Sequence, residues 1–545
     1  MHGLMMDMPL MISAIMEHAR HNFPRREIVT RTVEGPIHRY TYADAYERIG
    51  QLANALTALG VKPGDRVGTL AWNTHRHFEM YYAVSGLGAV LHTVNPRLFQ
   101  DQIVYIIRHA GDRFLFTDLT FVPLLEALQD HLPEVEGYVV MTDRAHMPAT
   151  RLRNAMCYEE LLEAQPAAWK RPEFDERTAS SLCYTSGTTG NPKGVLYSHR
   201  STVLHALGVL ACGPNHLHEG DVTMPIVPLF HANAWGVAYM APIAGAKIVF
   251  PGMRYDGNML YELMEQEGVT TSAGVPTVWF GLLGYMRQHS LRFSTVKRIG
   301  IGGSAAPPAM LREFIETYGV EPFQGWGMTE LSPVGTQGAL PFDLRGAPID
   351  EQVAYKSRQG RALFGVRLKA VDAGGREIPH DGKAFGELLC RGYWVASGYF
   401  RDDEATRAAM TADGWFRTGD VASFTPDNVM SLVDRFKDVI KSGGEWISSI
   451  DLENAAVGHP KIAEAAVVGV PHPKWDERPV LVCVPAPGEP PTADEILAYL
   501  RGRVAKWWLP DAVYFVPELP HTATGKIMKS KLREQYRDVL SAAAE

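Results

Sequence analysis

A segment of small and hydroxylated residues follows an apolar pair in the first half of the chain. Residues 184–195 read YTSGTTGNPKGV, directly after Leu182 and Cys183. Glycine lets the backbone approach a ligand closely, and amides and hydroxyls donate hydrogen bonds to phosphate oxygens. Lys193 adds a mobile positive charge. The pattern predicts a strand that ends in a polyphosphate-binding loop, although an ordinary flexible turn would have a similar composition.

The loop differs from the phosphate loop of the P-loop NTPases. That motif requires a glycine, four further residues and then Gly-Lys-Ser/Thr. Here Asn191 and Pro192 separate the last glycine from Lys193, and Gly194 follows the lysine. The sequence therefore disfavours a simple ATPase or kinase of the P-loop class.

The chain is too long to fold around one hydrophobic core. Its 545 residues are 46% apolar and 21% charged, as in globular proteins of two or more domains. The net charge of −8 argues against nucleic acid as the main partner. Five cysteines without CxxC spacing give no zinc signature and indicate a reducing cytoplasm.

The N-terminal segment, residues 1–20, is apolar and rich in methionine. It has Asp7 inside the apolar run, no basic region before that run and no small-residue cleavage site. These features favour a buried N-terminal helix over a signal peptide. No uninterrupted apolar run reaches the ~18 residues that a membrane span needs, so we expect a soluble cytoplasmic protein.

Helix, turn and strand patterns alternate along the chain. Apolar side chains recur on one helical face between Thr41, a candidate N-cap, and Gly60, and a turn then leads into the apolar run 67–72. Similar alternations lie near residues 246–251, 297–303 and 466–471. Such alternation is typical of α/β folds with mostly parallel sheets, whose sites lie at the carboxyl ends of the strands.

A charged segment marks the expected domain boundary. Residues 434–438 read DRFKD after a block rich in glycine and tryptophan, and the roughly 110 residues that follow suffice for a small domain. We expect a large α/β domain of several subdomains over residues 1–434. A small α+β lid domain would occupy residues 435–545.

Six further motifs are spread between residues 228 and 529. They are PLFHANAW at 228–235, IGGSAAP at 301–307, QGWGMTE at 324–330, GWFRTGD at 414–420, DRFKDVIKSGGEWISS at 434–449 and PHTATGKIMK at 520–529. With the phosphate loop, their wording resembles the adenylate-forming superfamily of acyl-CoA synthetases, luciferases and peptide-synthetase adenylation domains. GEWISS is similar to the medium- and long-chain fatty-acyl branch, which acts in fatty acid and lipid metabolism.

The resemblance implies ATP, Mg²⁺ and coenzyme A as cofactors and assigns residues to them. In relatives the aromatic at the position of Trp326 stacks on adenine, and residues matching Asp420 and Arg435 contact ribose. Many relatives have tyrosine in place of Trp326, so a hydroxyl is lost here while stacking is kept. The full set expected to bind the nucleotide or CoA is Thr185, Ser186, Gly187, Thr188, Thr189, Gly190, Lys193, Gly303, Ser304, Ala305, Gly325, Trp326, Gly327, Met328, Thr329, Asp420, Arg435, Lys441, Gly443, Gly444 and Trp446.

The resemblance also names His231, Glu330 and Lys526 as catalytic residues. A carboxylate that approaches a triphosphate is repelled, and a cation held in advance at such a site contributes about 10²–10³-fold to the rate. Lys526 matches the lysine that bridges the acyl carboxylate and the α-phosphate, and His231 matches a histidine at that carboxylate. Glu330 and Thr185 would help hold Mg²⁺, which prefers carboxylate and phosphate oxygens. Alone, His231 would read as a buried core histidine and Lys526 as a surface charge.

The implied reaction has two steps. A carboxylic acid attacks the α-phosphate of ATP to give acyl-AMP and pyrophosphate, and the CoA thiol then displaces AMP. Because water would destroy the anhydride, a closing lid is useful. Rotation about residues 434–437 would exchange Lys526 for the face of residues 441–446.

The acid is less constrained than the reaction. The residues expected at the acid are His231, Trp235, Gly302, Gly303, Trp326 and Pro333. If the bulky Trp235, Tyr239, Trp326 and Met328 all face the acyl site, the tunnel is shallow and suits a short or medium chain. The small sulfur-containing acid 3-methylmercaptopropionate fits such a pocket. Long-chain and aromatic acids stay open, as does whether Trp235 gates the tunnel or only packs.

Other functions share some of these motifs. A peptide-synthetase module would normally continue into a carrier domain, and a luciferase-like oxygenase shares every motif. A catalytically silent nucleotide-binding regulator is disfavoured because His231, Glu330, Asp420 and Lys526 are all retained. The expected partner is a small carboxylic acid, and a homodimer stays open.

Overall fold

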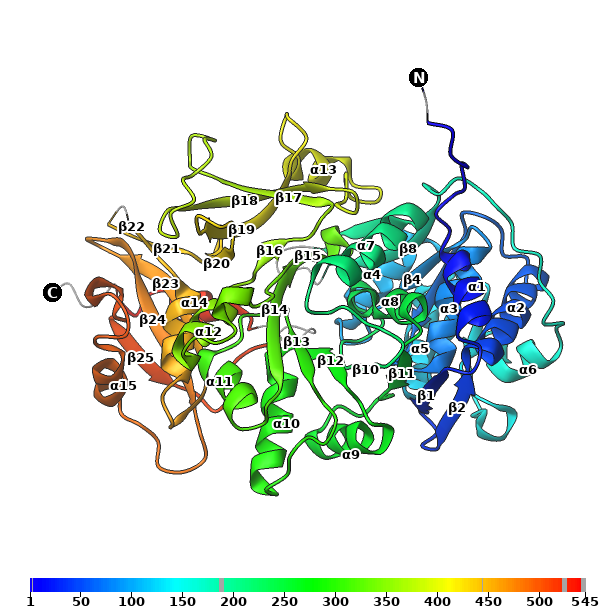
Figure 1. The fold of residues 1–545 in the computed structure, drawn as a ribbon, viewed down its shortest axis with the longest axis horizontal. Coiled ribbons are helices and arrows are strands. Elements are labelled where there is room, and N and C mark those ends of the chain that lie inside the picture. The colour runs from blue at the N-terminus through cyan, green and yellow to red at the C-terminus, as the bar shows by residue number, and fades with distance from the viewer. Residues whose placement is uncertain (2, 186–190, 444, 522–526, 541–545) are drawn as a thin grey trace.

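The structure is a computed structural model that describes residues 1, 3–185, 191–443, 445–521 and 527–540. The strands of the described residues form sheets of nine, seven, five and four strands. Figure 1 shows the blue N-terminal elements on one side of the molecule and the orange and red C-terminal elements on the other, with the green elements between them. The predicted fold class, α/β with a large N-terminal and a smaller C-terminal domain, is confirmed.

The nine-stranded sheet carries most of the candidate site. In spatial order its strands are β16 (Arg361–Ala362), β15 (Val334–Gln337), β14 (Glu321–Gly327), β13 (Arg298–Ile301), β12 (Thr271–Gly274), β10 (Val222–Pro225), β11 (Lys247–Phe250), β1 (Glu27–Arg31) and β2 (Ile37–Thr41). The strands from β14 to β1 run parallel, and β15, β16 and β2 are antiparallel to their neighbours.

The seven-stranded sheet leads into the phosphate loop. Its order is β7 (Ala155–Cys157), β6 (Gly137–Val140), β5 (Asp112–Thr117), β3 (Arg66–Leu70), β4 (Val90–Thr93), β8 (Ala179–Tyr184) and β9 (Gly194–Ser198). Strand β8 ends at Tyr184, where the sequence predicts the loop to begin, and β9 returns antiparallel to it. Residues 186–190 of the loop lie outside the described residues.

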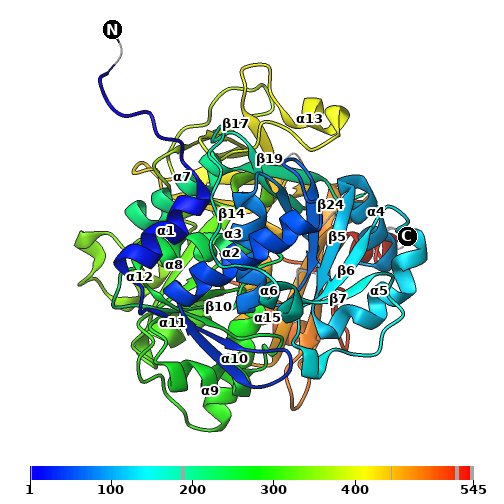
Figure 2. The same ribbon diagram turned by 90° about the vertical axis from the view of Figure 1, so that its right-hand side faces the viewer.

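Buried helices join the two large sheets. One core cluster combines side chains from both sheets with those of α1 (Ile12–Asn22), α2 (Tyr42–Ala58), α3 (His75–Gly86), α7 (His199–Cys212) and α8 (Val237–Ala244). Figure 2 shows α1, α2, α3 and α8 close together in front of β10 and β14. Every residue of α3 is buried. Short α6 (Tyr158–Glu163) lies beside α2.

Further helices cover the outer faces of both sheets. The nine-stranded sheet packs against α9 (Gly257–Glu267), α10 (Pro276–Gln288), α11 (Pro308–Glu316) and α12 (Ile349–Lys356). The seven-stranded sheet packs against α4 (Gln100–Ala110) and α5 (Val122–Leu128). The layers therefore alternate between helices and sheets.

Sequence expectations for two N-terminal helices are confirmed. In α1, residues Ile12, Ile15, Met16 and Ala19 are buried, although the helix begins only at Ile12 and the preceding Met1, Leu4, Met5, Met6 and Met8 are exposed. In α2, Thr41 caps the helix through a reciprocal pair of hydrogen bonds with Asp44, an arrangement that satisfies backbone amides left free at a helix start.

The C-terminal part builds two smaller sheets. The antiparallel four-stranded sheet holds β17 (Val366–Val371), β18 (Phe385–Gly392), β19 (Phe416–Phe424) and β20 (Met430–Arg435), with α13 (Asp403–Ala409) before β19. The five-stranded sheet holds β22 (Glu445–Ile447), β21 (Ile440–Ser442), β24 (Asp476–Pro485), β23 (Ile462–His472) and β25 (Ala512–Phe515). Helices α14 (Ser449–Val457), α15 (Ala493–Leu500) and α16 (Lys529–Gln535) cover this sheet. The predicted boundary, between 434 and 435, falls at the end of β20, and it stays a prediction.

Candidate active site

A cavity of about 380 Å³ lies between the carboxyl ends of β13 and β14 and the C-terminal elements. Its wall brings together residues from all seven sequence motifs. Those that the sequence assigned to the site and that line the cavity are Thr185, Lys193, His231, Trp235, Gly302, Gly303, Gly325, Trp326, Gly327, Met328, Thr329, Glu330, Pro333 and Arg435. Segments far apart in sequence thus meet where an α/β fold usually places its site.

Other assigned residues lie elsewhere. Asp420 is buried directly behind Trp326, while Ser304 and Ala305 follow β13 outside the wall of this cavity. Lys441 lies in β21, and Gly443 follows this strand. A second cavity of about 720 Å³ lies there and is lined by Ser442, Gly443, Trp475, Arg478, Trp507 and Asp511. The assignments to Ser186, Gly187, Thr188, Thr189, Gly190, Gly444 and Lys526, and to the side chain of Trp446, lie outside the described residues.

Trp326 is fixed from both sides. A Cβ atom at Gly335 would lie 2.7 Å from Cζ3 of the indole, so only glycine lets the ring pack onto β15. Its Nε1 donates a 2.7 Å hydrogen bond to Oδ2 of Asp420 on β19. Arg435 at the end of β20 places Nε 3.0 Å from Oδ1 of the same carboxylate.

The Asp420 carboxylate has acceptor capacity left. It is 1% exposed, and its Oδ1 accepts no hydrogen bond from the part of the chain that the structure describes, although Arg435 neutralises its charge. A buried carboxylate oxygen without a donor is costly unless a ligand supplies one. Ribose hydroxyl groups are such donors, so the residues present fit a nucleotide.

Glu330 lies in a short 3₁₀ turn, Thr329–Leu331, between β14 and β15. Its Oε1 accepts a 2.6 Å hydrogen bond from the Tyr399 hydroxyl, and Lys193 Nζ lies 4.9 Å from the centre of the Tyr399 ring. Burial raises the pKa of the Glu330 carboxyl above its ordinary value, while the Tyr399 hydrogen bond opposes this shift. A bound cation would favour the charged carboxylate.

Mg²⁺ fits beside Glu330 only together with phosphate. Within the described ranges, no group of three or more His, Cys, Asp or Glu side chains is arranged to hold a metal ion. Mg²⁺ is commonly bound by one or two carboxylates plus substrate phosphates and water. One buried carboxylate beside Thr185, Thr329 and Lys193 agrees with that mode.

His231 precedes an unusual left-handed turn. Residues Ala232 to Trp235 all have φ between 44° and 56° within the turn Ala232–Gly236, a conformation that costs non-glycine residues roughly 1–2 kcal/mol each. Asn233 fastens the turn, because its Nδ2 donates to Ser181 Oγ at 3.1 Å and its Oδ1 accepts from Tyr81 at 3.3 Å. Cys183 Sγ also donates to this Oδ1, at 3.4 Å.

The role of Asn233 was missed from the sequence. Asparagine tolerates left-handed backbone better than most residues, which was the only available signal, and it names no partner. Ser181 and Cys183 belong to β8, the strand that ends at the phosphate loop. Asn233 therefore ties the turn that bears His231 and Trp235 to the base of that loop.

Trp235 closes over the end of β13. Its side chain is half-buried and faces the cavity, and a Cβ atom at Gly302 would lie 2.8 Å from Cη2 of the indole. The glycine pair that the sequence assigned to ligand approach thus also makes room for this ring.

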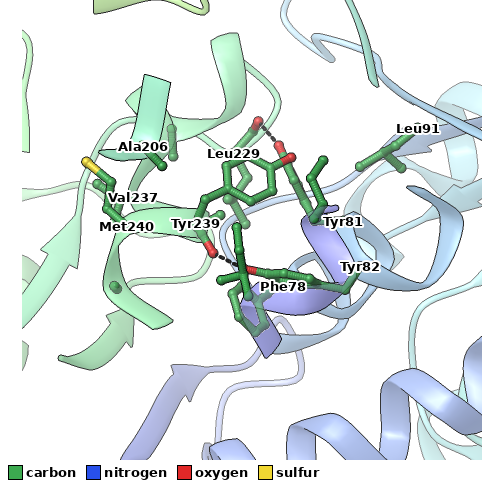
Figure 3. Packing of buried hydrophobic residues seen from close by; sticks show 14 of the residues in the cluster. Phe78, Tyr81, Tyr82, Leu91, Ala206, Leu229, Val237, Tyr239 and Met240 are labelled. Atoms are coloured by element: carbon green, nitrogen blue, oxygen red, sulfur yellow. Dashed lines mark hydrogen bonds between the residues drawn. The ribbon is translucent and has the colours of Figure 1, made fainter. Parts of the chain in front are cut away.

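The four bulky residues expected at the acyl site separate. Tyr239 is a core residue 2% exposed, and Figure 3 shows it between Tyr81 and Tyr82, whose hydroxyls donate to Leu229 O at 2.5 Å and to Ala238 O at 2.6 Å. Trp326 turns toward Asp420. Trp235 and Met328 line the cavity, as Trp326 also does. The idea that all four shorten the acyl tunnel is therefore wrong for Tyr239, because α8 points it into the core.

The C-terminal elements close the far side of the cavity. Lys437, Asp438, Met528, Lys529 and Arg533 line it. Lys529 Nζ is paired with Glu453 Oε1 at 2.7 Å and donates to Ser449 Oγ at 2.5 Å. Ser449 in turn donates through its amide to Asp434 at 2.8 Å.

This buried cluster connects Asp434 of β20 to Lys529 at the start of α16. Burial raises the pKa of the Glu453 carboxyl to about 7 and raises that of Asp434, while Lys529 opposes both shifts. Sequence reasoning missed Lys529, because a lysine among polar residues near the C-terminus resembles any surface charge.

Comparison with known proteins agrees with this fold. The family model of the AMP-binding enzyme matches residues 16–400, and the model of the AMP-binding enzyme C-terminal domain matches residues 451–526. The chain is 49% identical over 543 residues to 3-methylmercaptopropionyl-CoA ligase of Ruegeria lacuscaerulensis, covering 99% of this chain and 100% of the relative. It is 47% identical over 542 residues to a long-chain-fatty-acid–CoA ligase of Thermus thermophilus, covering 99% and 98%. The crystal structure of the anthranilate CoA ligase AuaEII in complex with anthranoyl-AMP superposes with a TM-score of 0.86 at 25% identity, covering 99% of both chains.

The chain therefore belongs to the AMP-binding enzymes, as its motifs predicted. The predicted enzyme class, an AMP-forming acid–thiol ligase that makes acyl-CoA through an acyl-adenylate, is confirmed, and its cofactors are ATP, Mg²⁺ and CoA. No helix within the described residues is long and apolar enough to cross a membrane.

Proposed function

We propose that this ligase activates a short- or medium-chain carboxylic acid, with 3-methylmercaptopropionate as the first candidate. One observation carries the reaction: Lys193, Glu330, His231 and Trp326 share one cavity, and the buried Asp420 lies behind Trp326. The relative of R. lacuscaerulensis supports the candidate acid at 49% identity. Long-chain acids are the second candidate, because the T. thermophilus relative is 47% identical.

Each residue has a proposed part in the first step. Asp420 and Arg435 hold the ribose, Trp326 stacks on adenine, and Thr329 contacts the α-phosphate. Glu330, together with phosphate oxygens, would hold Mg²⁺, which would supply positive charge beside the polyphosphate. His231 orients the acid, and Lys526 bridges its carboxylate to the α-phosphate, which lowers the repulsion between two anions.

The second step uses a different face of the C-terminal domain. We propose that rotation about residues 434–437 withdraws Lys526 and brings Lys441 to Trp446 to the cavity, where CoA enters. Gly443 has φ of 61°, and a Cβ atom there would lie 2.8 Å from Trp475. A substitution at Gly443 is therefore expected to slow thioester formation more than adenylation.

The test is AMP formation with ATP, Mg²⁺ and CoA across a panel of acids. The panel contains acetate to palmitate, 3-methylmercaptopropionate, benzoate and a cinnamate. Highest kcat/KM for 3-methylmercaptopropionate or for an acid of similar length supports the proposal. Highest kcat/KM for palmitate or for an aromatic acid contradicts it.

We also propose that the enzyme works in the cytoplasm as a homodimer. Cys157, Cys183, Cys212, Cys390 and Cys483 are all free thiols, which suits a reducing compartment. The exposed apolar side chains of residues 1–8 would be covered by a second copy. Light scattering on the purified protein tests the dimer, and fractionation of cells tests the compartment.

A further inference from the structure

The floor of the cavity is formed by one face of the nine-stranded sheet. Residues paired across neighbouring strands present their side chains on the same face, and the ladders pair Ala273 with Gly300, Gly300 with Phe323, and Gly325 with Gln337. All five residues line the cavity. Because the alanine and the glycines have little or no side chain, they leave this face of the sheet uncovered. Of the five residues, only Phe323 and Gln337 have large side chains.

Phe323 lies low on the floor. A Cβ atom at Gly300 would be 3.0 Å from Cζ and 3.1 Å from Cε2 of the ring, so the ring lies across Gly300. The Phe323 ring therefore lies against the sheet over Gly300 and does not project into the cavity above the sheet.

Gln337 instead spans the space between the sheet and helix α7. A Cβ atom at Gly325 would lie 3.7 Å from its Cγ, and one at Gly213 would lie 1.6 Å from its Oε1 and 2.7 Å from its Cδ. Gly213 is the residue that follows α7. The side chain is 7% exposed and forms a wall against Gly213, beside Asn215.

This wall lies at the end of the cavity opposite to Thr329 and Glu330, where the reaction would take place. Glu330 and Thr329 follow β14 past Gly327. Gly325, beside which Gln337 stands, lies two residues back along the strand, or roughly 7 Å from Gly327 at about 3.3 Å per residue. An acyl chain with its carboxylate near His231 and Glu330 would therefore run along the glycine floor toward Gln337.

We propose that Gln337, held against Gly213, is the specificity-determining residue that ends the acyl groove and limits the length of the acid. The inference rests on the proposed function and deepens it. Gln337 Oε1 has no hydrogen-bond donor in the described part of the chain. Because burying an amide oxygen without a donor is unfavourable, an apolar residue of equal length would stabilise the fold at least as well.

That reasoning supplies a matched control. Gln337→Met keeps a side chain of similar length, and Gln337→Ala removes the wall. The readout is kcat/KM for straight-chain acids of even length from acetate to dodecanoate, measured as AMP formation. We expect Gln337→Ala to move the optimum to longer acids. For the first acids beyond the wild-type limit, kcat/KM should rise by about tenfold or more, because binding one or two additional methylenes in an apolar pocket has an effect of that size. Gln337→Met should keep the wild-type limit.

Gly213→Ala tests the same contact from the other side. Its Cβ atom would occupy the place of the Gln337 amide and push that side chain into the groove, so the optimum should move to shorter acids. Adding Gln337→Ala to Gly213→Ala should reverse this shift, because the clash is gone, and the non-additivity measures the contact.

The outcomes separate this inference from the proposed function. Chain-length profiles of Gln337→Ala and Gly213→Ala that match wild type, in folded variants active on the preferred acid, overturn the inference. So does a shift in Gln337→Met as large as in Gln337→Ala, because polarity rather than length would then set the limit. Absence of AMP with every acid in the wild-type enzyme overturns the proposed function instead.

Discussion

The indole Nε1 of Trp326 donates a 2.7 Å hydrogen bond to Oδ2 of Asp420. The bond joins the end of β14 in the nine-stranded sheet to β19 in the four-stranded sheet. Arg435 places its Nε 3.0 Å from the other carboxylate oxygen, Oδ1. A tyrosine at position 326 would have no N–H at this point. The tryptophan therefore orients the carboxylate proposed to hold ribose.

Trp326→Phe should weaken ATP binding more than turnover. Phenylalanine keeps an aromatic ring that would stack on adenine. It removes the buried hydrogen bond from the indole N–H to the charged Asp420 carboxylate, and such a bond contributes about 1.5–3 kcal/mol. We expect KM for ATP to rise by roughly 10- to 100-fold, with kcat changed little at saturating ATP. Steady-state pyrophosphate release measures both constants, and Trp326→Tyr is the control that keeps a polar aromatic ring. An unchanged KM for ATP would show that the bond does not orient Asp420 for the nucleotide.

Glu330 should impose a pH limit on the magnesium-dependent step. Because burial raises its pKa, the carboxyl takes up a proton at a higher pH than an ordinary glutamate. Affinity for Mg·ATP should therefore fall as pH decreases through this raised pKa. Tyr399→Phe removes a hydrogen bond that lowers the pKa, so the fall should begin at a still higher pH. Titration calorimetry with Mg·ATP at several pH values checks this, and an identical pH profile in Tyr399→Phe contradicts it.

Glu330→Gln should stabilise the ligand-free protein while it removes activity. A folded-state pKa above the unfolded value means that the charged form is disfavoured on folding, so the stability associated with this group is lost as pH rises through the raised pKa. Glutamine avoids that cost at neutral pH. We expect a higher Tm without nucleotide and a loss of about 10²-fold or more in adenylation. A lower Tm than wild type at neutral pH would contradict the burial argument.

Asn233→Ala should disturb the acid more than the nucleotide. The variant loses the contacts to Ser181 and Tyr81 and places a further alanine in left-handed backbone. We expect kcat/KM for the acid to fall by roughly tenfold, which is about 1.4 kcal/mol, with KM for ATP nearly constant. Asn233→Gly is the matched control, because it tolerates the backbone and lacks only the hydrogen bonds. Equal losses for the acid and for ATP would indicate general unfolding of the site.

Lys529→Met should destabilise the C-terminal sheet. It leaves the buried carboxyls of Glu453 and Asp434 without their cation, and removal of one partner of a buried pair costs about 3–5 kcal/mol. Adding Glu453→Gln should recover much of this loss, since one uncompensated charge is gone. Urea unfolding and hydrogen exchange of residues in β23 and α14 measure the effect. A double variant no more stable than Lys529→Met would mean that the two side chains are not energetically coupled.

The sequence predicts much of the fold and most of the cavity wall. The motifs resemble those of a family with a known fold, and they also contain most of the residues that line the cavity. Helix α2 could be predicted with its cap because Thr41 and Asp44 are neighbours in sequence. The motifs assign Gly302 to the acid and Gly325 and Gly327 to the nucleotide, and all three lie in the wall.

What escaped prediction depends on contacts between distant residues. Asn233 meets Ser181, and Lys529 meets Glu453, only after the sheets have assembled. Gln337 and Gly213 are separated by more than a hundred residues, and neither type of residue signals a wall. Tyr239 is one of the bulky residues expected at the acyl site, yet α8 turns it into the core.

The central claim is most directly tested by AMP formation in wild type and in Lys526→Ala. With ATP, Mg²⁺, CoA and the preferred acid, the wild type should release AMP only when acid and CoA are both present. The variant should lose adenylation by about 10²-fold or more yet convert supplied acyl-AMP and CoA to thioester at close to the wild-type rate. Equal loss of both half-reactions, or AMP release that does not depend on the acid, would contradict the account.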